Sequence, residues 1–230
     1  MKTTKNLFVC SLFAFALIFN ANAQDPGKFN STVEKKVGPK KVAVPYTDVV
    51  SYLGYAAVDT EDEVVDGKKF YYIYIWIPAV APELGVRMMS PAGSAELKDP
   101  IVATNYEENK ASEDYFDTYI TLEKSDILKK EDITAEAVAA AKWTKLESND
   151  DSGEMPKNPG GNAYNSLLRC KSEASNPEKA LVVGLYRVGF TTYKTGEVSG
   201  TFLAQVGAPV KLPGVAMAKT IEELIEALKK

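Results

Sequence analysis

The chain has 230 residues, of which 45% are hydrophobic and 25% are charged, so it has enough apolar material for a core and is not of the disordered class. Its formal net charge is −4, and no long basic block is present, which excludes a nucleic-acid partner bound through its phosphates. The sequence contains no histidine, and this excludes a Ser-His-Asp triad, a Cys-His pair and an imidazole-ligated zinc site.

The N-terminus has the features of a signal peptide, which we assign to residues 1–23. Lys2 and Lys5 precede an apolar run, and Ala-Asn-Ala at 21–23 is a small-residue cleavage signal. We therefore expect cleavage before Gln24 and export to the periplasm, the outer-membrane surface or the extracellular space. The apolar run is shorter than the roughly 20 residues that a spanning helix needs. No later segment is as long, so no transmembrane segment is expected in the mature chain.

Cysteine usage excludes an intramolecular disulfide. Cleavage would remove Cys10 and leave Cys170 alone in the mature chain. Cys170 has no histidine to activate it, so we expect a packed residue rather than a nucleophile. Cys10 lies near the start of the apolar run, whereas a lipid-attachment cysteine would follow that run, so lipidation at Cys10 is not expected. Because no disulfide can fix the loops of this exported domain, and because the domain is rich in pairs of acidic residues, a bound metal ion is the obvious alternative way to hold the loops in place.

The mature chain is expected to form a leader followed by one domain. Residues 24–41 are polar and contain glycine, proline and several lysines, which is typical of a flexible leader. Residues 42–230 are expected to form a single β-sandwich domain. This domain begins with a segment rich in β-branched and aromatic residues, in which Pro45 and Gly54 indicate an edge, a bulge or a break.

The clearest strand is FYYIYIWI at residues 70–77. Asp66-Gly67 is a turn dipeptide just before it, and Pro78 ends it. Both faces of the segment are apolar or aromatic, so we expect a central strand that is covered on both sides.

A second β region spans residues 181–206. Two apolar segments flank KTGE at 194–197, where Gly196 can supply the positive φ of a short turn. The pattern therefore predicts a β-hairpin.

Two helices are predicted outside the strands. Residues 131–143 are rich in alanine, and Thr220 with Glu223 forms a capping box at the start of a C-terminal helix. The apolar stripe of that helix favours core packing over a partner surface, and it consists of Ile221, Leu224, Ile225 and Leu228. Because strands and helices do not alternate, the elements predict a mainly β fold, an antiparallel β-sandwich with a few peripheral helices.

The stretch ESNDDSGE at residues 147–154 places four carboxylates in eight residues. It fails as an EF-hand loop, because serine and proline occupy the first and last ligand positions. Glycine and proline interrupt residues 147–164, so the backbone is expected to be irregular, and Asp150 with Asp151 could supply the charge of a calcium site. By composition alone, a solvated acidic loop is the favoured alternative.

Four blocks of the sequence resemble the major leptospiral surface lipoprotein family. The two longest are FYYIYIWIPAVAPELGVRMMSP at 70–91 and GLYRVGFTTYKTGEVSG at 184–200. YFDTYI at 115–120 and YNSLLR at 164–169 resemble two further blocks in the same order. The resemblance covers residues 64–207, which is most of the mature domain.

This resemblance implies a jelly-roll-like sandwich at the outer membrane that binds Ca²⁺ and contacts host extracellular-matrix proteins. The family holds the ion with an Asp-Thr pair, two adjacent loop aspartates and a tyrosine. Carried over to the matching positions of this chain, these metal ligands are Asp117, Thr118, Asp150, Asp151 and Tyr164. Glu147, Ser148 and Asn149 replace aspartates of the family's loop, which implies a weaker affinity. The signal also lacks the lipid-attachment cysteine, and the C-terminal helix is shorter than the family's lysine-rich tail.

We therefore expect a non-enzymatic calcium-binding envelope or surface protein, a binding or adhesion module whose loops are ordered by Ca²⁺. Two alternatives remain open. One is a carbohydrate-active β-sandwich enzyme in which two carboxylates act as acid and base. The other is a purely structural envelope protein.

Overall fold

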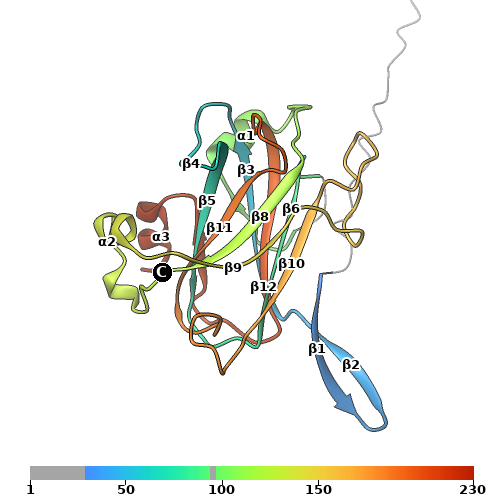
Figure 1. The fold of residues 1–230 in the computed structure, drawn as a ribbon, viewed down its shortest axis with the longest axis vertical. Coiled ribbons are helices and arrows are strands. Elements are labelled where there is room, and N and C mark those ends of the chain that lie inside the picture. Colours follow the sequence, from blue (N-terminus) through green and yellow to red (C-terminus); the bar gives the residue numbers. More distant parts are fainter. Residues whose placement is uncertain (1–28, 94–96) are drawn as a thin grey trace, which may run out of the picture.

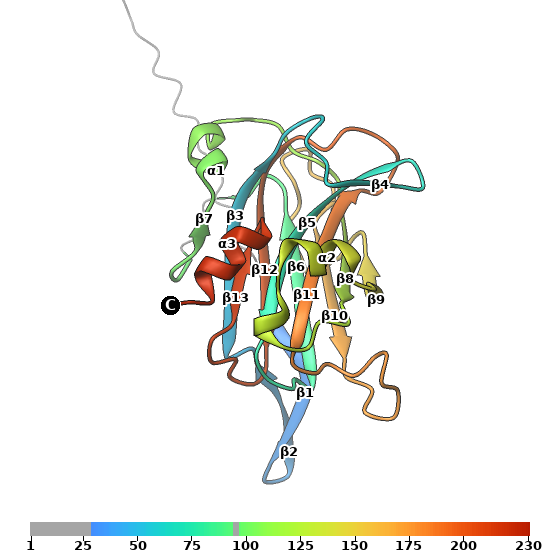
Figure 2. The same ribbon diagram turned by 90° about the vertical axis from the view of Figure 1, so that its left-hand side faces the viewer.

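The computed structural model describes residues 29–93 and 97–230, so the predicted signal peptide lies outside the described residues. Two β-sheets pack face to face around one apolar core (Figures 1 and 2). The fold is mainly β and sandwich-like, with a few helices and one of them at the C-terminus, which confirms the predicted fold class.

The first sheet has five strands in the order β10–β6–β12–β3–β7. Neighbouring strands are antiparallel except β3 and β7, which are parallel. The bounds are β3 Asp48–Ala56, β6 Glu83–Met89, β7 Ile101–Val102, β10 Ser166–Lys171 and β12 Gly200–Ala208.

The second sheet has the order β13–β5–β11–β8–β9, and β4 also pairs with β5. All of its pairs are antiparallel. The bounds are β4 Glu63–Val65, β5 Lys68–Ile77, β8 Thr118–Lys124, β9 Thr144–Asn149, β11 Gly184–Thr192 and β13 Ala216–Ala218.

Strand β5 is covered on both faces, as predicted. Its Tyr71 and Ile73 belong to the core between the sheets, whereas Trp76 belongs to a second apolar cluster that includes residues of α2 and α3. Because side chains alternate along a strand, β5 separates two apolar layers. The turn before it also forms as predicted, with Asp66 at φ 51° and Gly67 at φ 77° between β4 and β5.

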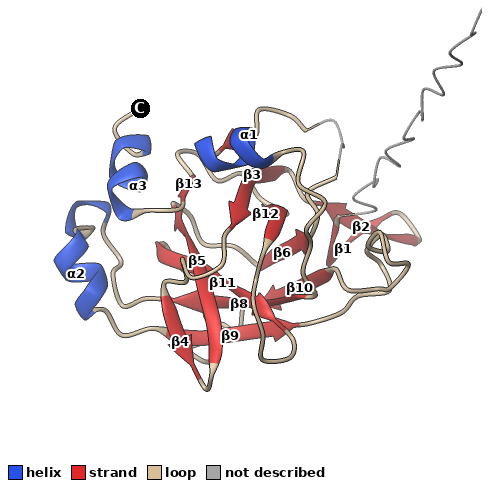
Figure 3. Cartoon of the chain, turned by 90° about the horizontal axis from the view of Figure 1, so that it is seen from above, coloured by secondary structure: helices blue, strands red, loops and turns tan. Residues whose placement is uncertain are grey.

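Among the described residues, three short α-helices lie outside the sheets. Figure 3 shows α2 and α3 beside each other, and both contribute to the apolar cluster around Trp76. The predicted capping box of Thr220 and Glu223 starts α3, and the apolar stripe of α3 packs inward as expected. Helix α2 is shorter than the helix predicted at 131–143, because a 3-10 turn precedes its N-cap Thr134. The bounds are α1 Thr104–Asn109, the 3-10 turn Lys130–Asp132, α2 Ala135–Ala140 and α3 Ile221–Ala227.

The predicted hairpin over residues 181–206 is wrong. Strands β11 and β12 lie in different sheets, and the connection between them crosses the sandwich. Gly196 is not among the glycines with positive φ, whereas Gly200 has φ 136°. Both strands are largely buried on both faces, and each fills a central position in its own sheet.

The predicted flexible leader also requires correction in its described part. Residues Asn30–Val37 form β1 and Lys40–Pro45 form β2, and the two strands pair as a hairpin that extends beyond the sandwich (Figures 1 and 2). Gly38 supplies the turn with φ 59°. Sequence analysis missed β1 because its sequence, NSTVEKKV, does not alternate apolar and polar side chains, whereas the strand-like pattern from residue 42 onward was recognised.

Candidate functional site

Three chain segments meet at one end of the second sheet. Strand β8 starts at Thr118, directly after Asp117, and β9 ends just before Asp150. Ile120 of β8 lies opposite Asn149 of β9, so the start of β8 and the end of β9 reach the same edge. The loop that follows β9 then crosses to β10 in the other sheet (Figure 1).

Thr118, at the start of β8, is bonded to the segment that directly precedes β10. Its backbone amide donates to the carbonyl oxygen of Tyr164 at 3.0 Å, and its hydroxyl Oγ1 donates to the same oxygen at 3.1 Å. Thr118 is fully buried, so the donor side of both bonds is shielded from water. Tyr164 itself keeps 37% of its surface exposed. Its carbonyl is therefore engaged by Thr118, while its ring faces outward.

Ser166 brings in the acidic loop. Its hydroxyl lies 2.7 Å from Oγ1 of Thr118, and it is within hydrogen-bonding reach of the carbonyl oxygens of Thr118 and Asp150. Ser166 is fully buried. One hydroxyl thus connects the start of β8, the end of β9 and the start of β10.

The place where these three segments meet is called the acidic corner below. Within it, the carboxylate of Asp117 has an unusual environment. Its Oδ1 atom is buried and has no hydrogen-bond partner among the described residues. Burial, followed by the charges of Asp151 and Asp150, raises the pKa of this carboxyl to about 6, although Lys194 and Lys68 oppose the shift. The three carboxylates are therefore close enough to repel one another.

The two loop aspartates are more accessible. Asp150 is half-buried and Asp151 is exposed. The amide of Asp151 donates to Oδ1 of Asp150 at 2.8 Å, so one oxygen of Asp150 already holds the loop backbone. Burial and the neighbouring charge of Asp150 raise the pKa of Asp151. Carboxylate oxygen on Asp150 and Asp151 thus remains available at the edge of the corner.

The structure brings all five sequence-predicted ligand residues into this corner, but it does not arrange them as a finished shell. Within residues 29–93 and 97–230, no three Asp, Glu, His or Cys side chains converge so that they could hold a metal ion.

The rest of the loop is held by asparagines that sequence analysis missed. The amide of Asn162 donates to Oδ1 of Asn158 at 3.0 Å, and the amide of Ser152 donates to the carbonyl oxygen of Asn165 at 3.1 Å. Asn165 is fully buried, and its side chain bonds the backbone of Ser90 and Pro156. The sequence feature that could have indicated these asparagines is the polar segment NAYNS at residues 162–166, which leads into the mostly apolar strand β10.

Arg169 ties the same loop to the N-terminal hairpin. Its guanidinium donates to both carboxylate oxygens of Glu154 at 2.8 Å, and its Nε donates to the carbonyl oxygen of Asn30 at 2.8 Å. The bond from Arg169 lowers the pKa of Glu154. Not every acid of the loop is therefore available to a metal ion.

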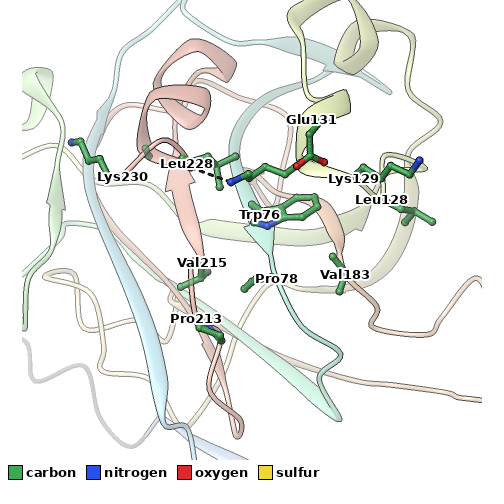
Figure 4. A pocket seen from close by; sticks show the side chains of 13 residues that line it. Trp76, Pro78, Leu128, Lys129, Glu131, Val183, Pro213, Val215, Leu228 and Lys230 are labelled. Atoms are coloured by element: carbon green, nitrogen blue, oxygen red, sulfur yellow. Dashed lines mark hydrogen bonds between the residues drawn. The ribbon is translucent and has the colours of Figure 1, made fainter.

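A cavity in another part of the molecule is lined mainly by apolar residues. It measures about 780 Å³, has Trp76 and Pro78 among its apolar lining residues, and is bordered by Lys129 and Lys230 (Figure 4). None of the five predicted ligand residues lines it. It is therefore separate from the acidic corner.

A second cavity, of about 710 Å³, is lined by aromatic rings and charged groups. The guanidinium of Arg187 lies 3.6 Å from the ring centre of Tyr72 and 4.3 Å from that of Trp143. Three carboxylates line this cavity: Glu63 accepts from the hydroxyl of Tyr72 at 2.8 Å, Asp62 is bound by Lys219, and Glu222 forms no ion pair with the described residues. A pair of free carboxylates is thus not found between these rings.

Cys170 fits the predicted role of a packed residue. It is buried and free, and burial raises the pKa of its thiol to about 11. A thiol that stays protonated in this way is a poor nucleophile.

Comparison with known proteins gives a family. A family model described as the surface lipoprotein of the Spirochaetales order (Lipl32) matches residues 40–217. No curated protein matches the chain. No helix among the described residues is long and apolar enough to cross a membrane. The family match covers most of the chain and both sheets of the sandwich, so this chain belongs to the surface lipoprotein family of the Spirochaetales.

Proposed function

We propose that this chain is a non-enzymatic, calcium-stabilised surface-binding module of the cell envelope. The observation that carries the proposal is the buried, unpartnered Oδ1 of Asp117 in the field of Asp150 and Asp151. A buried carboxylate without a hydrogen-bond donor is costly, and two further negative charges increase the cost. A divalent cation would offset both effects.

The chemistry of the corner favours calcium. Asp117, Asp150 and Asp151 offer carboxylate oxygens, Thr118 and Tyr164 offer hydroxyl or carbonyl oxygens, and water would complete a shell of six to eight. The irregular loop between β9 and β10 suits the flexible geometry of calcium better than the strict octahedron of magnesium. Zinc is disfavoured, because the chain contains no histidine and burial keeps the thiol of Cys170 protonated.

Calcium would act by fixing a surface rather than by catalysing a reaction. The ion would join the start of β8 to the loop that precedes β10, which reinforces the bonds made by Thr118 and Ser166. The ordered loop would then present the exposed ring of Tyr164 and its neighbours to a partner. An extracellular-matrix or other surface protein is the partner class that the family resemblance implies.

Thermal unfolding tests this function. The melting temperature of residues 24–230 should rise when calcium replaces a chelator, since an ion that binds only the folded state stabilises it by about 2.7 kcal/mol at one hundred times its Kd. Asp150→Asn with Asp151→Asn should abolish the rise. The matched control is Glu107→Gln with Glu108→Gln, an adjacent exposed acid pair on α1, which should leave the rise intact. A melting temperature that calcium does not change would sink the proposal.

A carbohydrate-active enzyme is the second candidate, and the aromatic cavity around Tyr72 and Trp143 is the observation in its favour. Of its three lining carboxylates, Glu63 is held by Tyr72 and Asp62 by Lys219, which leaves only Glu222 without such a partner among the described residues and weakens the case for an acid–base pair. Release of new reducing ends from a polysaccharide panel, unaffected by chelation, would favour this enzyme over the calcium module.

A further inference from the structure

The tip of the N-terminal hairpin has no cover within the described structure. Every residue from Glu34 to Ala43 is exposed, and the hairpin extends away from the sandwich (Figures 1 and 2). Its contacts with the sandwich lie at its base, where Thr32 donates to Glu83 and Arg169 donates to the carbonyl oxygen of Asn30. An isolated two-stranded hairpin is marginally stable in water, so a projecting tip of this kind gains from a partner.

The charge of the chain is divided between this hairpin and the sandwich. The hairpin, residues 30–45, carries four lysines and one glutamate, whereas residues 46–230 carry 20 basic and 29 acidic side chains. The projecting element is thus cationic on an otherwise anionic protein. Such a distribution directs the hairpin, and not the sandwich, toward a negatively charged surface.

The strand register places apolar and basic side chains together on one face of the tip. Lys35 lies opposite Val42, and Val37 lies opposite Lys40, so these four side chains share a face. Val37 and Val42 keep 59% and 50% of their surface exposed. On the other face Lys41 pairs with Glu34 at 3.2 Å, whereas Lys35 and Lys40 have no carboxylate within 4 Å among the described residues.

We propose that the tip of this hairpin binds the surface of a bilayer that contains anionic lipids. The two valines would enter the headgroup region, and the lysines beside them would contact lipid phosphates. The basic residues of the hairpin are all lysine, a point charge that suits mobile headgroups, rather than arginine, which suits fixed bidentate recognition of a protein carboxylate. The tip is also a convex end, not a concave site that would enclose a small ligand.

The length of the hairpin makes this contact compatible with an acidic sandwich. Val37 lies four residues beyond Val33, the last half-buried residue of β1, which corresponds to roughly 13 Å of strand. That distance exceeds the Debye length of about 8 Å at physiological ionic strength. The negative charge of the sandwich is therefore largely screened from the lipid surface that the tip contacts.

Vesicle co-sedimentation of residues 24–230 tests the proposal. The protein should bind vesicles of phosphatidylcholine mixed with phosphatidylglycerol, should bind pure phosphatidylcholine weakly, and should dissociate at high salt. Each lysine near an anionic surface strengthens binding by about fivefold, so Lys35→Gln with Lys40→Gln should weaken it by roughly 25-fold. Val37→Asp should weaken it as well. Lys129→Gln with Lys130→Gln, the same charge change on the sandwich, is the matched control and should bind as the parent does.

The outcomes separate a lipid surface from other partners. A Val37→Trp variant should show a blue-shifted emission with anionic vesicles, which places the tip in the headgroup region. Equal binding to both vesicle types, or a Lys35→Gln/Lys40→Gln variant that binds like the parent, would overturn the proposal. Self-association that the same two substitutions abolish, without vesicle binding, would assign the tip to a second copy and would also overturn it. Calcium binding is measured separately and does not enter these outcomes.

Discussion

The backbone amide of Thr118 donates to the carbonyl oxygen of Tyr164 at 3.0 Å, and this bond joins two residues that are 46 positions apart in the sequence. Thr118 opens β8 in one sheet, and Tyr164 lies two residues before β10 in the other. Asp117 precedes Thr118 directly, and Asp150 of the β9–β10 loop is linked to Thr118 through the hydroxyl of Ser166. The geometry of the candidate site therefore depends on how the two sheets are joined at this end.

Loss of the Ser166 hydroxyl should destabilise this junction. Ser166→Ala removes the single hydroxyl proton that the carbonyl oxygens of Thr118 and Asp150 share, and we expect a loss of about 1–3 kcal/mol in the free energy of unfolding. Denaturant unfolding measures this loss. Ser199→Ala is the control, since that half-buried hydroxyl makes one bond of 3.3 Å to Asp114. Equal costs for the two substitutions would contradict the role assigned to Ser166.

Asp117 should give the calcium-free protein a pH-dependent stability. Its pKa in the folded state, about 6, lies above the unfolded value of about 3.9, so the folded state binds more protons between these values. The free energy of unfolding in chelator should then fall as pH rises from about 4 to about 6. Asp117→Asn should flatten this slope, and unfolding curves across that pH range provide the measurement. A parent protein with no such fall would show that the carboxyl is not held as described.

Glu83 should make the base of the N-terminal hairpin less stable at low pH, which is the opposite of the pH dependence expected from Asp117. Burial raises the pKa of Glu83, but hydrogen bonds from Thr32 and Tyr46 outweigh that effect and lower it. The stabilisation is thus present above the unfolded pKa and is lost as pH falls through the lower folded value. Glu83→Gln should weaken these charged bonds by about 1.5–3 kcal/mol in total. Faster amide hydrogen exchange in β1 at neutral pH is the expected result, and unchanged exchange would count against it.

Substitutions at Gly196 and Gly200 distinguish the observed connection, which passes from one sheet to the other, from the hairpin that the sequence predicts. Gly200 has φ 136°, and a Cβ there would lie 2.4 Å from the carbonyl oxygen of Asp114, so Gly200→Ala should cost about 2–4 kcal/mol. At Gly196 the nearest atom to a Cβ is 3.8 Å away, and φ is not positive, so Gly196→Ala should be tolerated. Melting temperatures of the two variants decide the matter. If Gly196→Ala lowered the melting temperature more than Gly200→Ala did, the result would support a hairpin turn at Gly196 instead.

Local features could be predicted from the sequence, because their causes lie within a few residues. The Asp66-Gly67 turn and the Thr220 capping box follow from backbone and side-chain chemistry over four residues, and both form. The pairing of β11 could not be predicted in this way. A loop such as KTGE permits either a hairpin or a crossing, and the choice depends on strands far away in the sequence.

The chemistry of the loop indicated Asp150 and Asp151 as possible calcium ligands, whereas Asp117, Thr118 and Tyr164 were predicted only by the family resemblance. Composition and spacing favoured a solvated acidic loop, because Asp117 and Asp150 are separated by a strand, a helix and another strand. The residues that hold the corner together, Ser166 and Asn165, were missed for a related reason: their partners are backbone atoms of distant segments. The polar segment NAYNS could indicate that these residues matter, but it does not identify the distant backbone atoms that they contact.

Isothermal calorimetric titration of residues 24–230 with calcium tests the central claim most directly. The account predicts one site per chain that saturates at around 10⁻⁴ to 10⁻³ M, the range of extracellular calcium modules, and that disappears in Asp150→Asn with Asp151→Asn. A titration without saturable heat, in protein that is folded by circular dichroism, would contradict it.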